Sequence, residues 1–154
     1  MKKYFAKLML LPAFVALVAG LGCKSSEANL PPAAGVNLTA MGATIQTDPK
    51  GNVIEMDLTA KPVGNGDLAA IARHLHLQTL WLTKTGVTDA GLADLQPLRQ
   101  LRVLGLARTG ITDAGLKHLA AIKSLREIWI YPTKISEDAV DDLKTALPGV
   151  RVIY

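Results

Sequence analysis

Apolar residues recur along this chain with a period of 24 residues. Three successive copies of the pattern L-x-x-L-x-L, in which isoleucine can replace the later leucines, begin at Leu77, Leu101 and Leu125. The last three residues of each copy alternate, so their two apolar side chains face one way and the middle one faces the other, as in a half-buried strand. After a turn, leucine or isoleucine returns at every third residue, which indicates a short helix with one apolar face. Each copy therefore predicts one strand followed by one helix.

Polar residues mark the start of each predicted helix. Thr88, Thr112 and Ser136 are good N-caps, because a hydroxyl oxygen can accept a hydrogen bond from a free amide of the first turn. An acidic residue follows each cap, and its charge suits the positive end of the helix dipole. Threonines at 85, 109 and 133 come shortly before the caps. We expect their hydroxyls to point inward and to bond the turn backbone of a neighbouring repeat.

The repeats extend beyond the three clear copies. Val53, Met56 and Leu58 match the strand positions one period before Leu77, which predicts a more divergent first repeat. The segment 48–51 reads Asp-Pro-Lys-Gly, a turn sequence, and predicts a β-hairpin that caps the first repeat. The predicted domain consists of a cap, four repeats and a terminal strand: 42–52, 53–76, 77–100, 101–124, 125–149 and 150–154.

The middle residues of the strands form rows on the exposed face of the predicted sheet. The central row is Asp57, Trp81, Gly105 and Trp129. Because neighbouring strands lie about 4.8 Å apart, we expect the two tryptophans to stand about 10 Å apart with only the glycine between them. The adjacent rows are Glu55, Thr79, Val103, Glu127 and Val152 on one side and Thr59, Thr83, Ala107 and Tyr131 on the other.

The tryptophans make this face a candidate binding surface. Each tryptophan can bury about 150 to 250 Å² and carries an N–H donor, so an apolar or flat group could insert between them over Gly105. The alternative is that the tryptophans lean over the glycine and shield the sheet themselves. Two arginines, at 102 and 126, lie toward the margins. The candidate partner-binding residues are Trp81, Gly105, Trp129, Tyr131, Val103, Arg102 and Arg126.

The polar residues predict neither a catalytic nor a metal site. His74 and His76 are two residues apart, which places them on different faces of a helix, and His118 belongs to another helix. No serine has an ordered histidine and acid partner, and no G-x-G-x-x-G motif follows a strand. We therefore expect a protein that is not an enzyme and that binds no cofactor or metal.

The first 23 residues follow a different pattern. Three lysines precede an uncharged apolar stretch at 8–21, and small residues lead into Cys23, the single cysteine. This stretch is typical of a signal peptide and is short for a membrane-spanning helix, which needs about 20 residues. The segment Ala19-Gly20-Leu21-Gly22-Cys23 resembles a bacterial lipobox, in which the cysteine is lipidated and becomes the new N-terminus. We expect a signal peptide at 1–22; an uncleaved anchor or ordinary secretion is the alternative.

The net charge of the chain comes largely from this segment. The chain carries a formal charge of +4, from 17 basic and 13 acidic residues, and removal of the three lysines in the signal peptide leaves 14 basic residues against 13. No clustered basic face of the kind that binds nucleic acid is predicted. A single cysteine excludes an intramolecular disulfide. After the lipidated cysteine, the segment to residue 41 is rich in Ser, Pro, Ala and Gly and indicates a flexible tether, so the second predicted region is 23–41.

Residues 42–154 resemble the leucine-rich repeats of the ribonuclease-inhibitor-like class, in the form L-x-x-L-x-L-x-x-T-x-[VI]-T-D-A-G-L that is found in bacterial envelope lipoproteins. The resemblance implies an α/β fold: a short solenoid of right-handed βα repeats, with a parallel sheet on the concave face and a hairpin cap at the N-terminal end. It also implies a curved scaffold that binds other proteins, and it brings no catalytic residue with it.

We therefore expect a lipoprotein of the bacterial cell envelope that is anchored to a membrane through Cys23, on the periplasmic or the outer surface. Its predicted role is to bind a protein partner on the concave sheet face. A structural lipoprotein that associates weakly with itself or with the cell wall is one alternative. A module that binds a glycan or a small ligand between the tryptophans is the other.

Overall fold

The computed structural model describes residues 38 and 41–153. The predicted signal peptide, Cys23 and nearly all of the tether lie outside the described residues, and so does Tyr154. No helix in the described part is both long and apolar enough to span a bilayer. The elements are, in chain order, β1 (Thr44–Thr47), β2 (Val53–Asp57), α1 (Asn65–Ile71), β3 (Thr79–Trp81), α2 (Asp89–Leu92), the 3-10 helix η1 (Ala93–Leu95), β4 (Val103–Gly105), α3 (Asp113–Leu119), β5 (Glu127–Trp129), α4 (Glu137–Ala146) and β6 (Arg151–Ile153).

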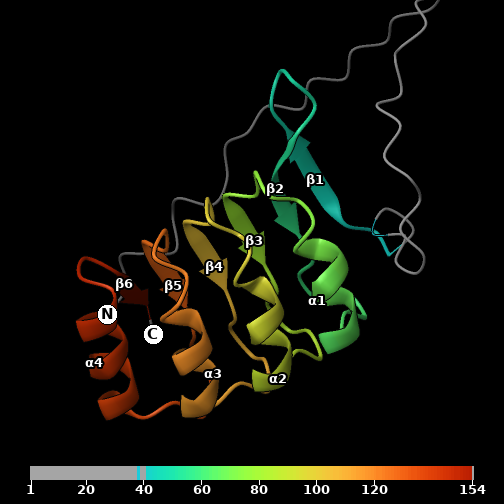
Figure 1. The fold of residues 1–154 in the computed structure, drawn as a ribbon. Coiled ribbons are helices and arrows are strands. Elements are labelled where there is room, and N and C mark those ends of the chain that lie inside the picture. The colour runs from blue at the N-terminus through green and yellow to red at the C-terminus, as the bar shows by residue number, and fades with distance from the viewer. Residues whose placement is uncertain (1–37, 39–40, 154) are drawn as a thin grey trace, which may run out of the picture. The chain divides into compact units, whose positions relative to one another are not determined.

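The six strands form one sheet whose spatial order is the order of the chain. β1 and β2 pair antiparallel as a hairpin, and every later pair is parallel. Figure 1 shows the four helices side by side on one side of this sheet, so that each repeat leaves the sheet, passes through its helix and returns as the next strand. The predicted fold is confirmed: this is a short leucine-rich-repeat solenoid of mixed α/β class with an N-terminal hairpin.

The hydrophobic core lies between the sheet and the helices. Met56, Leu80, Leu104 and Ile128 occupy the same register in neighbouring strands and are fully buried. Helix leucines from each repeat close this row from the other side, because they recur at steps of three along one helix face. Each such side chain stabilises the fold by about 1.5 to 3 kcal/mol relative to an exposed one, so the core is a stack of equivalent layers.

The terminal strand differs by one residue from the predicted register. We predicted that Val152 continues the exposed row of Val103 and Glu127. In the structure Glu127 pairs with Arg151, and Val152 pairs with Ile128, so the valine continues the inward row. The 24-residue period persists into β6, and a slip of one residue would exchange every inward and outward side chain of the strand.

Two of the three turn threonines bond within their own repeat, so the predicted bond to a neighbouring repeat is wrong for Thr85 and Thr109. The Thr85 hydroxyl donates to the Leu82 carbonyl at 2.7 Å, and the Thr109 hydroxyl donates to the Leu106 carbonyl at 2.6 Å. Successive turns are joined instead by backbone bonds, such as the one from the Gly86 amide to the Val63 carbonyl at 2.9 Å. The hydroxyl therefore satisfies the carbonyl of the first residue after its strand, where the chain leaves the sheet.

Two of the three predicted N-caps are confirmed. Thr112 accepts a hydrogen bond from the Ala114 amide at 3.4 Å, and Ser136 accepts one from the Ala139 amide at 3.2 Å. The Thr88 hydroxyl makes no such bond and accepts one from the Asn65 side chain instead. The α-helix that Thr88 precedes is also the shortest of the described part, because the chain continues from Ala93 to Leu95 as the 3-10 helix η1.

Candidate binding surface on the sheet

The two tryptophans come from equivalent positions of β3 and β5, with Gly105 of β4 in register between them. Their ring centroids are 6.1 Å apart, and the ring planes are inclined by 59°. The predicted separation of about 10 Å is therefore wrong. It assumed side chains that stand upright on the sheet, whereas the two rings approach each other in a tilted aromatic pair, a favourable geometry.

Gly105 lies beneath the ring of Trp81. The glycine is buried, and a Cβ added to it would overlap the ring atom Cε3 and lie 2.8 Å from Cζ3. The open notch that we predicted over this glycine is thus filled by the half-buried Trp81 itself. For Trp81, the structure therefore agrees with the alternative drawn from the sequence, in which a tryptophan leans over the glycine and shields the sheet.

Trp129 is the more accessible member of the pair, with 37% of its surface exposed. Its indole Nε1–H donates to the Glu127 carboxylate at 2.8 Å, and the other oxygen of that carboxylate lies 3.7 Å from Arg151 Nη1. The indole N–H is therefore already used within the sheet. A partner would meet the face and edge of the ring, rather than the N–H donor that the sequence suggested.

Tyr131 follows two residues later and is 67% exposed. One residue, Ile130, separates it from the end of β5, and a cis peptide bond joins it to Pro132. Val103, at the start of β4, is half-buried on the same exposed row as Thr79 and Glu127. We call the surface formed by Trp81, Trp129, Tyr131 and Val103 the aromatic face. Gly105, the remaining predicted site residue of this row, lies beneath it and is covered by the Trp81 ring.

Arg102 and Arg126 lie in a different part of the surface from the aromatic face. Both residues come immediately before a strand, and they line a separate pocket of about 440 Å³ at the amino ends of β3, β4 and β5. We call it the arginine pocket; its lining residues are Gln78, Arg99, Gln100, Arg102, Ser124 and Arg126. The sequence analysis did not include Arg99, although it stands three residues before Arg102 and thus near the same edge.

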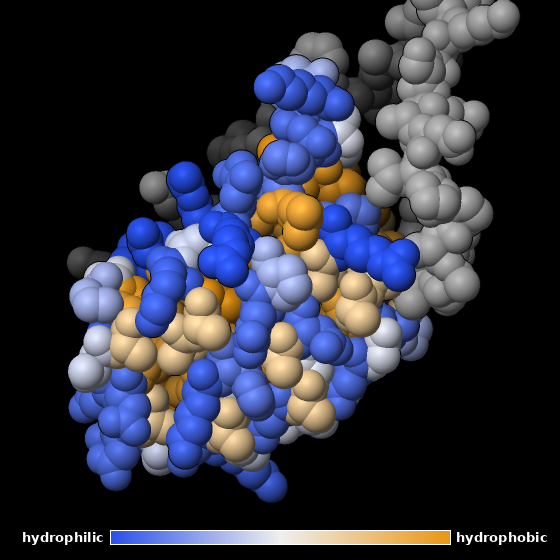
Figure 2. All heavy atoms as spheres, in the orientation of Figure 1, coloured by the Kyte–Doolittle hydropathy of each residue, from blue (hydrophilic) through white to orange (hydrophobic). Residues whose placement is uncertain are grey.

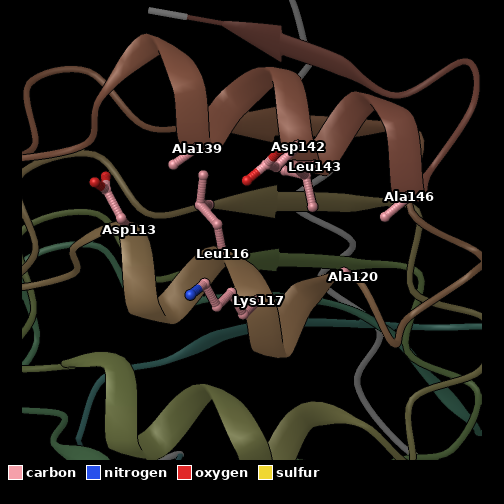
Figure 3. Close-up of a pocket in the computed structure, with 8 residues that line it drawn as sticks. All are labelled: Asp113, Leu116, Lys117, Ala120, Ala139, Asp142, Leu143 and Ala146. Atoms are coloured by element: carbon pink, nitrogen blue, oxygen red, sulfur yellow. The ribbon is translucent and has the colours of Figure 1, made fainter.

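A third hollow lies between α3 and α4 and has a volume of about 220 Å³ (Figure 3). Leu116 and Leu143 reach into it from the two helices, and Ala139 stands where the two preceding helices carry glycine. At Gly115 a Cβ would lie 3.0 Å from Leu92 Cδ1, so glycine lets α2 and α3 pack closely. Figure 2 shows mostly polar side chains over this helical side, with small apolar areas between them. The hollow is a packing gap at the alanine.

The titratable groups with shifted pKa values have structural causes away from the aromatic face. Partial burial lowers the pKa of His74, which favours its neutral form. Hydrogen bonds from Asn52 lower the pKa of Asp48 in the hairpin turn, and those from Ser136 lower the pKa of Asp113. Among the described residues, no three histidine, cysteine or acidic side chains are placed to hold a metal ion.

Comparison with known proteins adds two solved structures of low similarity. The chain resembles the crystal structure of PEPR1-AtPEP1 with a TM-score of 0.43 and 17% identity, over 71% of this chain and 19% of that one. It resembles an internalin (inlF) from Listeria monocytogenes with a TM-score of 0.40 and 15% identity, over 56% and 31%. No family model and no curated protein sequence matches the chain. It spans less than a third of each solved chain, and its leucine-rich-repeat fold is shown by its own sheet, helices and core.

Proposed function

We propose that this protein is a protein-interaction module that binds its partner on the aromatic face. The observation that carries the proposal is the pair of exposed aromatic side chains, Trp129 and Tyr131, at and just beyond the end of β5. Large exposed aromatic side chains are a common mark of interaction sites, and they are enriched among the residues that contribute most to binding.

The surroundings of Trp129 favour binding because they hold the ring in one place. Its indole N–H is bonded to Glu127, and the ring of Trp81 packs against it on the side of Gly105. A side chain that is already ordered loses little conformational freedom when a partner arrives. The partner group that suits this face is apolar or flat, since the nearby charges of Glu127 and Arg151 are already paired with each other.

We also propose that Cys23 carries a lipid that anchors the domain to a membrane of the bacterial envelope, with the segment to residue 41 as a tether. The proposal rests on the lysine-rich start, the apolar stretch and the lipobox-like sequence before the cysteine. Replacement Cys23→Ala should abolish acyl labelling and partitioning into detergent. Unchanged labelling of the variant would remove the anchor from the proposal.

The partner-binding proposal is tested by crosslinking from the native envelope with the full-length chain as bait. The test variant is Trp129→Ala/Tyr131→Ala, and the matched control is Leu75→Ala, which removes a side chain that is 56% exposed but lies outside the sheet. Circular dichroism should first show that all three proteins are folded. A partner captured by the wild type and by the control, but lost from the double variant, supports the aromatic face.

The captured protein, once purified, should bind the wild type directly. Its Kd for the double variant should be at least about tenfold higher, as expected when side chains that anchor an interface are removed. Equal binding by both proteins would refute the aromatic face as the site. Two other readouts favour the alternatives. Concentration-dependent size would indicate self-association, and quenching of tryptophan fluorescence by soluble wall fragments would indicate glycan binding.

A further inference from the structure

The arginine pocket collects positive charge without a carboxylate. Its six lining side chains include three arginines, at 99, 102 and 126, and the rest are two glutamines and a serine. Within the described part of the chain, the ion pairs are Lys144–Asp141 and Arg151–Glu127, so none of the three pocket arginines takes part in one. An arginine-rich pocket of this kind is suited to an anion, because guanidinium groups match oxyanions in charge and geometry.

The repeat geometry places two of these arginines at neighbouring backbone positions. Arg102 and Arg126 hold the same position in successive repeats, and the Arg126 amide donates to the Arg102 carbonyl at 2.8 Å. Neighbouring strands are about 4.8 Å apart, and like charges placed opposite each other on adjacent strands are destabilising. An anion bound in the pocket would offset the repulsion between two like charges at neighbouring positions.

One arginine is already held in position. Arg126 Nη1 donates to the carbonyls of Lys123 at 3.1 Å and Leu125 at 2.8 Å, and its other guanidinium N–H groups have no acceptor among the described residues. Gln100 adds a neutral polar group, whose amide lies 3.4 Å from a His76 ring nitrogen. For Arg99 and Arg102, the described residues supply no hydrogen-bond acceptor to the side chain. The pocket thus combines one ordered guanidinium with two that are available to a ligand.

We propose that the arginine pocket binds a phosphate group. A carboxylate offers two oxygens and one charge, and a single arginine satisfies it in a bidentate pair. A phosphate monoester carries a charge of about −1.5 to −2 at pH 7 and three acceptor oxygens, which matches a pocket lined by three arginines better. Inorganic phosphate and phosphate esters share this chemistry. The proposal is independent of the aromatic face, since none of its residues lies in that surface.

Isothermal titration of the full-length chain, in nonionic detergent and in a low-salt buffer free of phosphate and sulfate, tests this site. The probes are inorganic phosphate, glycerol 3-phosphate and dimethyl phosphate. The test variant is Arg99→Gln/Arg102→Gln, which removes the two arginines whose side chains have no partner among residues 41–153 and leaves the bonds of Arg126 to its neighbouring carbonyls intact. The matched control is Arg73→Gln/Arg108→Gln, which removes the same charge from exposed positions outside the pocket.

Saturable binding of inorganic phosphate to the wild type and the control, weakened at least about tenfold in the test variant and by added salt, is the expected result. Tightest binding of glycerol 3-phosphate would identify an esterified source, such as a head group, and dimethyl phosphate should bind most weakly because it carries a single charge. No saturable binding up to about 10 mM phosphate would overturn the proposal, because such binding is too weak for a site of charge-assisted hydrogen bonds. Equal weakening of phosphate binding in both double variants would also overturn it, because that result indicates an effect of net charge and not of the pocket.

Discussion

Gly105 determines how the aromatic face is built. It stands in the row of the two tryptophans, and its lack of a side chain lets the Trp81 ring lie across the strand and meet Trp129 at 6.1 Å. Its role here is close approach and has nothing to do with backbone conformation, since its φ angle lies outside the left-handed region. One missing methyl group thus decides which tryptophan is covered and which one faces outward.

Replacement Gly105→Ala should lower the free energy of unfolding by about 1 to 3 kcal/mol, because the new Cβ overlaps the Trp81 ring. The displaced ring should also change the tryptophan emission spectrum. Urea denaturation followed by circular dichroism measures the first effect, and fluorescence measures the second.

A double-mutant cycle supplies the control for this prediction. In a Trp81→Ala background the added methyl group has room, so the cost of Gly105→Ala should fall close to zero. An equal cost in both backgrounds would mean that the glycine is required for another reason.

At the scale of elements, the helix starts of neighbouring repeats are tied together by a side-chain ladder. Asp89 accepts hydrogen bonds from the amide and the hydroxyl of Thr112, both at 2.7 Å. Asp113 accepts the corresponding bonds from Ser136, at 2.8 and 2.9 Å. From the sequence we predicted only a helix-dipole role for these two aspartates. Their regular spacing from the next cap was the signal that could have revealed the ladder.

The ladder makes stability depend on pH. The bonds from Ser136 lower the pKa of Asp113 below its usual value, so folding favours the carboxylate. Its contribution is therefore fully present above the unfolded pKa of about 3.9, and it is lost as the pH falls through the lower folded value. The urea midpoint of Asp113→Asn should lie below that of the wild type at about pH 6, and the difference should shrink toward about pH 2.

Asp142→Asn is the matched control for this measurement. Asp142 is an exposed carboxylate on α4, and it accepts no hydrogen bond from the described residues. Its midpoint should follow that of the wild type across the whole range. If Asp113→Asn shows the same pH profile as this control, the ladder does not contribute to stability.

At the scale of the whole molecule, the described domain is a single stack in which each repeat packs on its neighbours. The buried side chains form one cluster that runs from the N-terminal hairpin to the turn before β6. Such an array is stabilised mainly by contacts between adjacent repeats, and about three repeats are needed for a stable stack. With four repeats, this domain is only slightly longer than that minimum, so disruption of one layer should destabilise the whole stack.

Removal of a central layer should therefore affect the entire array. Leu104→Ala truncates a fully buried side chain of β4, and we expect a loss of about 2 to 5 kcal/mol in the free energy of unfolding. Val152→Ala, at the half-buried end of the sheet, should cost less. Circular dichroism and tryptophan fluorescence in urea should give one coincident transition for both variants; separate transitions would show that the repeats unfold independently.

The sequence by itself determined the repeat, the fold and the identity of the exposed row. A period of 24 residues, alternation within Leu80-Trp81-Leu82 and its equivalents, and the turn at 48–51 are local signals, and each follows from the geometry of a strand, a helix or a turn. Because every repeat uses the same inward positions, one correct assignment carried over to the others. The wrong register at Val152 arose because the 24-residue period, which places Arg151 beside Glu127, was not applied to the terminal strand.

Only the tertiary structure decided which side chains meet. The tilt of Trp81 over Gly105 and the bond from Trp129 to Glu127 depend on side-chain rotamers. A rotamer is chosen by the space and the partners that neighbouring repeats leave free, and the spacing of residues along the chain does not contain that information. The same limit explains the gap at Ala139, which exists because two helices meet there without the glycine that the earlier pairs share.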